Sequence, residues 1–186
     1  MQQTTRADAR RNRDALLAAA AEVVAEHGTN ASLRDVARRA GVGIGTLYRH
    51  FPTRESLLES LLDANFAVLR RRADELISSP DPSEALLVWL RELAAGSATY
   101  EGLPESIMDA LADEQSALHG ACAEMRSAGG RLLERAQQAG DVRSSLTIRA
   151  VIAVALGLAW AGQRSQEVLG QVDDLLSAAI GLRVRE

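Results

Sequence analysis

The feature that most limits the fold of this chain is residues 32–51, which read as two short helices bent around a pair of glycines. Ser32 stands where a helix N-cap belongs, and Gly41 follows the first helix at the position where a left-handed residue usually ends one. The first helix has one apolar face, with the spacing i, i+3, i+4 and i+7: Leu33, Val36, Ala37 and Ala40. Phe51 precedes a proline, which disfavours helical backbone angles, so the second helix ends there. This layout is typical of a helix-turn-helix that lays its second helix in the major groove of DNA.

The second of these helices has two chemically different sides. At 100° per residue its packing side carries Ile44, Leu47, Tyr48 and Phe51, and the opposite side carries Gly45, Thr46, Arg49 and His50. On that opposite side Arg49 can donate two hydrogen bonds to guanine, Thr46 offers a hydroxyl and a methyl, and Gly45 permits close approach. Tyr48 and His50 suit phosphate oxygens better. Any small helical protein can expose one such residue, but the arrangement as a unit favours DNA reading.

Residues 17–62 resemble the TetR family of bacterial transcriptional regulators, most densely over residues 40–55. The resemblance implies that Thr46, Tyr48, Arg49 and His50 contact DNA, with Arg54 at the start of the next helix. The full set of DNA-binding candidates is Ser32, Arg34, Gly43, Gly45, Thr46, Tyr48, Arg49, His50 and Arg54. Many relatives carry Ser or Thr in place of Gly43, so here we expect the reading helix to begin at bare backbone amides.

Charge is divided along the chain in agreement with this interpretation. All 21 basic residues are arginine, and residues 1–54 carry a net charge of +4 whereas the remainder carries −8. A basic head joined to an acidic body suits a protein that neutralises phosphates with one end only. The chain begins with a basic lead-in, made of Arg6, Arg10, Arg11 and Arg13. This segment is either a disordered arm that follows the minor groove or the DNA backbone, or a solvated charged tail.

Composition predicts an all-α protein. With 47% hydrophobic but only 3% aromatic residues, the core consists mostly of Leu, Ala and Val, which favours close-packed helices. The longest uncharged apolar stretch, residues 150–162, is shorter than the ~20 residues that span a bilayer. Residues 15–21 belong to an amphipathic helix rather than a signal peptide. We therefore expect a cytoplasmic protein without a membrane partner, in which the lone Cys122 is a small core residue.

We expect about nine helices in two domains. Residues 1–53 form a three-helix DNA-binding domain, whose first helix spans about residues 11–27. Residues 54–186 form a helical domain for ligand binding and dimerisation, opened by a helix of about 36 Å over residues 54–77. Arg70, Arg71 and Arg72 form a solvated or salt-bridged run on this helix. Further apolar stripes continue to residue 180, one of them over residues 107–111.

By resemblance, several family members use the space within this second domain as a ligand cavity. The aromatic, methionine and cysteine side chains that are candidates to line it are Phe66, Trp89, Tyr100, Met108, Cys122 and Met125. For each of them, simple core filling is the stronger alternative.

The last two apolar stripes predict a helical hairpin that pairs with its copy in a four-helix bundle. The candidate dimer-interface residues are Val151, Ile152, Ala155, Leu158, Ala159, Gly162, Val172, Leu175, Leu176 and Ala179. Packing of the same hairpin within one chain is the alternative. Residues 132–143 and the pairs Leu175-Leu176 and Gly181-Leu182 resemble the SbtR-like branch of the family more loosely.

Other function classes have little support. Gly41-x-Gly43-x-Gly45 lacks a preceding strand and has Thr46 where a dinucleotide fingerprint needs glycine. The three histidines lack metal-site spacing, and Asp109, Asp113 and Glu114 suit an exposed acidic face better than catalysis. We therefore expect no enzyme, cofactor or metal.

The expected function is a ligand-responsive homodimeric repressor, which binds a palindromic double-stranded DNA operator and is released by an apolar or amphipathic effector. The alternatives are an activator or effector-independent regulator of the same fold and, less favoured, a helical adaptor.

Overall fold

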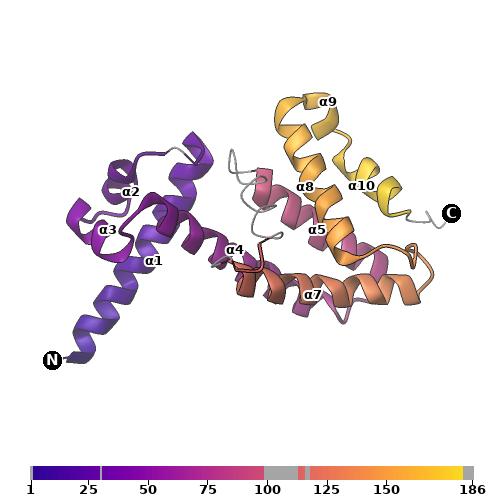
Figure 1. Ribbon diagram of the computed structural model, residues 1–186, viewed down its shortest axis with the longest axis horizontal. Helices are drawn as coiled ribbons and strands as arrows, with labels where there is room; N and C mark the ends of the chain where they lie inside the picture. Colours follow the sequence, from indigo (N-terminus) through magenta and orange to yellow (C-terminus); the bar gives the residue numbers. More distant parts are fainter. Residues whose placement is uncertain (1, 30, 99–112, 116–117, 182–186) are drawn as a thin grey trace. The chain divides into compact units, whose positions relative to one another are not determined.

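The computed structural model describes residues 2–29, 31–98, 113–115 and 118–181, and the regular elements in these ranges are all α-helices, as predicted (Figure 1). The chain divides into two compact units, one ending at Ala64 and the other beginning at Asn65. This division falls inside a helix, later than the domain boundary expected from the sequence. The predicted helix over residues 107–111 lies outside the described residues.

The first unit contains α1 (Gln2–His27), α2 (Leu33–Arg39), α3 (Ile44–His50) and the beginning of α4 (Arg54–Leu76). The core of this unit contains Leu16, Ala20 and Val23 of α1 together with buried residues of the other helices. The sequence prediction placed the start of the first helix near residue 11, and this was wrong: helix begins at Gln2, so the basic lead-in is helical. The reason is local, because residues 2–10 contain no glycine or proline and are rich in good helix formers.

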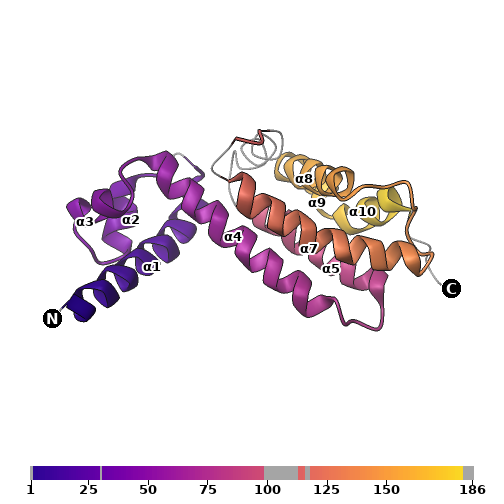
Figure 2. The same ribbon diagram turned by 60° about the horizontal axis from the view of Figure 1, so that its bottom comes forward.

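The second unit contains the rest of α4 together with α5 (Pro82–Ala98), α7 (His119–Gln138), α8 (Ile148–Arg164), α9 (Gln166–Leu169) and α10 (Val172–Ile180). Helix α5 packs against α7, α8 and α10, and the views in Figures 1 and 2 agree on this arrangement. Trp89 of α5 is fully buried, and the Nε1 of the Trp89 indole donates a 2.9 Å hydrogen bond to the carbonyl oxygen of Leu69 in α4. Trp89 therefore joins α5 to α4.

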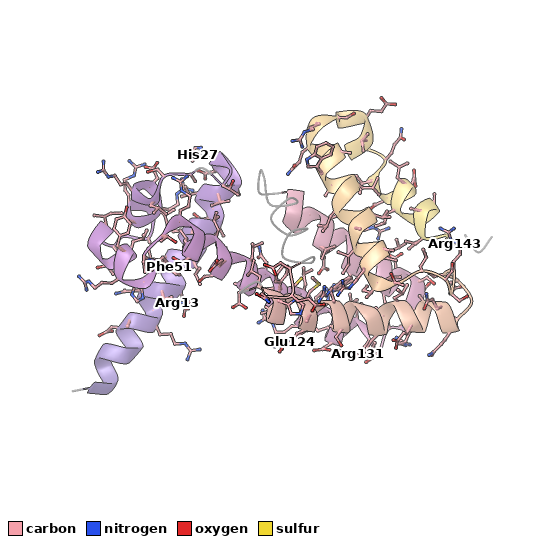
Figure 3. All side chains as sticks on the ribbon, viewed as in Figure 1. Arg13, His27, Phe51, Glu124, Arg131 and Arg143 are labelled. Atoms are coloured by element: carbon pink, nitrogen blue, oxygen red, sulfur yellow. The ribbon has the colours of Figure 1, made fainter. Side chains whose placement is uncertain are left out.

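Ion pairs also bind the second part of α4 to its neighbours. Arg70 pairs with Glu124 of α7, and Arg72 pairs with Glu92 of α5 at 2.8 Å. The labels in Figure 3 mark Glu124 and Arg131 on α7, where Arg131 pairs with Asp74 of α4. The expected salt-bridged character of the arginine run is confirmed for Arg70 and Arg72. No helix within the described ranges is long and apolar enough to cross a membrane.

Candidate nucleic-acid interface

The turn between α2 and α3 has the geometry that the sequence predicts. The Ser32 side chain caps α2 by accepting a hydrogen bond from the Arg34 backbone N–H at 3.2 Å. Gly41 has a φ of +68°, a left-handed conformation that a side chain would strain. Gly43 is the N-cap of α3 and makes no side-chain cap hydrogen bond, so α3 begins at bare backbone amides, as expected.

Helix α3 is held in the first unit by two buried side chains. Leu47 is 0% exposed, and Phe51, which ends the helix, is 1% exposed. The guanidinium carbon of Arg13 in α1 lies 5.5 Å from the centroid of the Phe51 ring, and Arg13 also donates to Ser60 Oγ at 3.3 Å (Figure 3). These contacts fix α3 against α1 and the beginning of α4.

Two residues assigned to the packing side are in fact exposed. Ile44 is 38% exposed and Tyr48 is 49% exposed, so the expectation that both pack was wrong. A helix of two turns has only a narrow surface that can pack against its neighbours, and here the i, i+4 pair Leu47 and Phe51 occupies that surface. Tyr48 is therefore accessible, and its contact with phosphate stays a prediction.

The remaining candidates are mostly accessible to solvent. Gly45, Arg49, Ser32, Arg34 and Gly43 are exposed, whereas Thr46, His50 and Arg54 are half-buried. Within the described ranges, the side chains of Arg34 and Arg49 have no hydrogen-bond or ion-pair partner.

The neighbouring arginines of α2 are engaged instead. Arg38 pairs with Asp35 at 2.7 Å, and Arg39 pairs with Glu26. Arg34 and Arg49, two of the three arginines expected at the DNA, are thus left available to an external anion.

A clamp between α1 and α2 was not predicted from the sequence. Arg39 donates two hydrogen bonds to the Glu26 carboxylate, at 2.6 and 2.8 Å, and this bidentate pair holds the end of α1 against the end of α2. The hydrogen bonds from Arg39 lower the pKa of Glu26 and raise the pKa of Arg39. In the sequence, Glu26 and Arg39 carry opposite charges near the ends of two consecutive helices, but this does not show which residues pair.

The candidates for a ligand cavity are buried where they are described. Phe66, Trp89, Cys122 and Met125 are each at most 3% exposed, and Tyr100 and Met108 lie outside the described residues. Burial raises the pKa of the Cys122 thiol, which favours a neutral, unreactive side chain. Burial alone does not separate cavity lining from core filling, so the assignment of a cavity stays a prediction.

Most of the candidate dimer-interface residues do not lie on a free surface. Six are buried within the single chain, which corrects their assignment: Val151, Ile152, Ala155, Ala159, Gly162 and Leu176. They are buried because α8 and α10 pack against α5 and each other. Leu175 is 38% exposed, and Leu158, Val172 and Ala179 are half-buried, so these four remain candidates.

Comparison with known proteins assigns both parts of the chain. Residues 16–61 match the family described as bacterial regulatory proteins, tetR family, and residues 81–184 match the SbtR-like transcriptional regulator C-terminal domain.

Solved structures agree with these two matches. The TetR transcriptional regulator SCO0520 from Streptomyces coelicolor is 32% identical, with a TM-score of 0.70 and coverage of 94% of this chain and 99% of that one. The TetR regulatory protein from Mycobacterium vanbaalenii is 33% identical, with a TM-score of 0.68 and coverage of 97% and 99%. RolR in complex with resorcinol, at 19% identity, a TM-score of 0.62 and coverage of 95% and 90%, shares the fold.

Proposed function

The chain belongs to the TetR family of bacterial transcriptional regulators, which are not enzymes, and on this premise we propose a homodimeric repressor released from a palindromic operator by a small molecule. The observation that carries the proposal is the state of Arg49 on α3, which is exposed and has no partner within the described part of the chain. Leu47, two positions earlier, is fully buried and fixes the orientation of the helix. An arginine held in this way has both its charge and its fork of donors available for guanine.

The surface around Arg49 supports the same assignment. Tyr48, next to Arg49 in the sequence, and Arg34 in the first turn of α2 are also exposed. Both suit phosphate oxygens, and contacts of that kind position a reading helix without specifying sequence. Thr46 and His50 are half-buried, and we propose that they contact DNA atoms that lie close to α3. A short reading helix covers few base pairs, so specificity requires two copies that read two half-sites.

The test is selection of bound fragments from the genome of the source organism with purified protein, followed by titration of the recovered DNA. Arg49→Ala is expected to weaken binding by about 1–3 kcal/mol and to relax preference at one base pair. Arg71→Ala is the matched control, because Arg71 in the second unit is also exposed and without a partner in the described ranges. Equal affinity and equal preference of the Arg49 variant and the control would contradict the assignment.

We place the dimer contact on the outer face of α8 and α10. Val154 and Trp160 of α8 are 36% and 49% exposed, and Leu175 of α10 is 38% exposed, although all three are apolar. Helices α8 and α10 contact each other, so these side chains belong to neighbouring elements of one unit. Two such hairpins related by a twofold axis would bury these side chains in a four-helix bundle.

Val154→Glu is expected to produce monomers in light-scattering chromatography, because it places a charge in the proposed contact. Val68→Glu is the control: Val68 is 50% exposed on α4, away from α8 and α10 in the chain, and the same substitution there should leave the dimer intact. Monomers from both variants, or dimers from both, would remove this face from the proposal.

Release by an effector is supported by the fold rather than by a ligand. RolR, which shares the fold, was solved in complex with resorcinol, so a protein with this fold can bind a small molecule. Repression is tested by the position of the selected fragment, since a site that overlaps a promoter blocks polymerase. A site upstream of the promoter would instead favour an activator.

A further inference from the structure

A groove lined by polar side chains lies between α4 and α7 in the second unit, with a volume of about 280 Å³. Figure 2 shows these two helices side by side, and the labels in Figure 3 mark Glu124 and Arg131 at the α7 side of the groove. None of the lining residues is apolar, and none is a candidate for the effector cavity. The lining residues are Arg70, Arg71, Asp74, Glu124, Ser127 and Arg131.

The spacing of these residues explains why a groove forms here. Glu124, Ser127 and Arg131 are spaced i, i+3 and i+7, so they share one side of α7. Arg70 and Asp74, spaced i and i+4, share one side of α4. All the lining residues are exposed. Because two polar sides meet at this point, apolar packing does not close the space between the helices.

Ion pairs account for four of the six lining side chains. Arg70 pairs with Glu124, and Arg131 pairs with Asp74. Each arginine makes one hydrogen bond in its pair, through Nη1 of Arg70 and Nη2 of Arg131. A guanidinium has five N–H donors, so both arginines have donors left for a ligand. Exposed ion pairs contribute little to stability, so these arginines can turn toward a ligand at low cost.

The other two lining side chains, Arg71 and Ser127, are not accounted for by these pairs. Both are exposed, and neither has a hydrogen-bond or ion-pair partner within the part of the chain that the structure describes. With three arginines and two carboxylates, the groove has a net charge of +1. Several guanidinium groups together with a hydroxyl form a set of donors that suits the oxygens of a phosphate group.

We propose that the groove between α4 and α7 binds a phosphate group, either as inorganic phosphate or as the monoester of a small polar molecule. Arg71 is the main contact, Arg70 and Arg131 donate from either side, and the Ser127 hydroxyl donates a further hydrogen bond. The ligand is small, because the groove lies below the range of about 300–1,000 Å³ that is typical of small-molecule pockets. The site does not depend on DNA binding, since all its residues belong to the second unit.

The test is calorimetric titration of the whole chain with inorganic phosphate and with glycerol 1-phosphate, at an ionic strength held constant with sodium chloride. The unmodified protein should bind at least one of the two compounds. Arg71→Ala should weaken this binding by about tenfold or more, which is the value of a hydrogen bond between charged groups, and Ser127→Ala should weaken it by a smaller factor. Arg71 is exposed and has no partner among the described residues, so its removal should not disturb folding.

Arg49→Ala is the matched control. Arg49 is likewise exposed and without a partner in the described ranges, but it lies on α3 in the first unit. Its removal should leave the affinity for phosphate unchanged. Phosphate that binds at the DNA-binding surface instead would be lost with Arg49→Ala and kept with Arg71→Ala, and this result would overturn the inference.

The remaining outcomes also decide the matter. Unchanged binding in the Arg71 variant, or no binding of either compound to the unmodified protein, overturns the inference. Tighter binding of glycerol 1-phosphate identifies the ligand as a monoester, whereas equal or tighter binding of inorganic phosphate identifies it as the free ion; both results support a phosphate site. DNA affinity is measured separately in phosphate-free buffer, where Arg71→Ala should keep it and Arg49→Ala should lose it. Failure of the phosphate site and failure of the proposed function therefore give different results.

Discussion

The Trp89 side chain of α5 packs on Gly129 of α7, and this contact predicts how a substitution at the glycine changes stability. A Cβ atom added to Gly129 of α7 would lie 2.3 Å from Cη2 of Trp89, 2.7 Å from Cζ3 and 2.8 Å from Cζ2. Ordinary contact between carbon atoms is about 3.5–4.0 Å, so the indole would have to move by more than an ångström. Trp89 is 0% exposed, and its Nε1 is bonded to Leu69, so movement in any direction disturbs packing or that hydrogen bond.

The expected loss of stability in Gly129→Ala follows from three contributions. Overpacking of a dense core costs about 1–3 kcal/mol. A weakened hydrogen bond from Nε1 adds about 1 kcal/mol to this loss. Replacing glycine by alanine within a helix stabilises the helix by about 0.8–1 kcal/mol and so offsets part of the loss. The free energy of unfolding should therefore fall by about 1–3 kcal/mol.

The adjacent glycine is the matched control for this variant. A Cβ atom at Gly130 would meet Cγ2 of Ile148 at 4.0 Å, which is an ordinary contact. Gly130→Ala should therefore gain about 0.5–1 kcal/mol from helix propensity alone. Urea unfolding followed by circular dichroism measures both variants, and their free energies of unfolding should differ by about 1.5–4 kcal/mol.

A second substitution tests the cause of the loss. In Gly129→Ala combined with Trp89→Phe, the smaller ring leaves room for the methyl group, so the double variant should lose less than the sum of the single losses. If Gly129→Ala is as stable as Gly130→Ala, or if the two losses simply add, then Trp89 does not pack on Gly129 in the way described.

Three further predictions concern single groups. Hydrogen bonds from Arg39 lower the pKa of Glu26, so this ion pair stabilises the folded protein above the unfolded-state pKa of Glu26, and the stabilisation is lost as the pH falls through the folded-state pKa. The melting temperature of Glu26→Gln should therefore lie below that of the unmodified protein at neutral pH, and the two melting temperatures should converge in acid. Cys122, buried and with a raised pKa, should react with a thiol reagent only when urea unfolds the protein, and fast labelling of the native state would contradict its burial. Thr147→Ala should cost about 1 kcal/mol in urea unfolding, because the Thr147 hydroxyl caps α8 by accepting from the Ala150 N–H; an unchanged midpoint would show that the cap contributes nothing.

The DNA-binding element could be predicted from sequence because its signals are local. A cap at Ser32, a left-handed glycine at Gly41 and a proline after Phe51 act within a few residues, and the structure has each helix end where they indicate. The exposure of Ile44 and Tyr48 was not predictable in this way, because it depends on how much of α3 the other helices cover. The pairing of Arg39 with Glu26 likewise depends on tertiary contact, which periodicity does not describe.

The dimer-interface prediction was wrong for the buried residues of α8 for a related reason. A helical stripe shows that a face is apolar but does not identify what covers it, and α8 is apolar on more than one side. Packing within the chain covers Val151, Ile152 and Ala155, whereas Val154 and Trp160 remain 36% and 49% exposed. After the chain has packed, α8 still exposes apolar side chains. Large exposed apolar patches are typical of sites where proteins associate. The buried residues therefore account for the fold of one chain, and the exposed ones are those at which we propose that a second copy meets it.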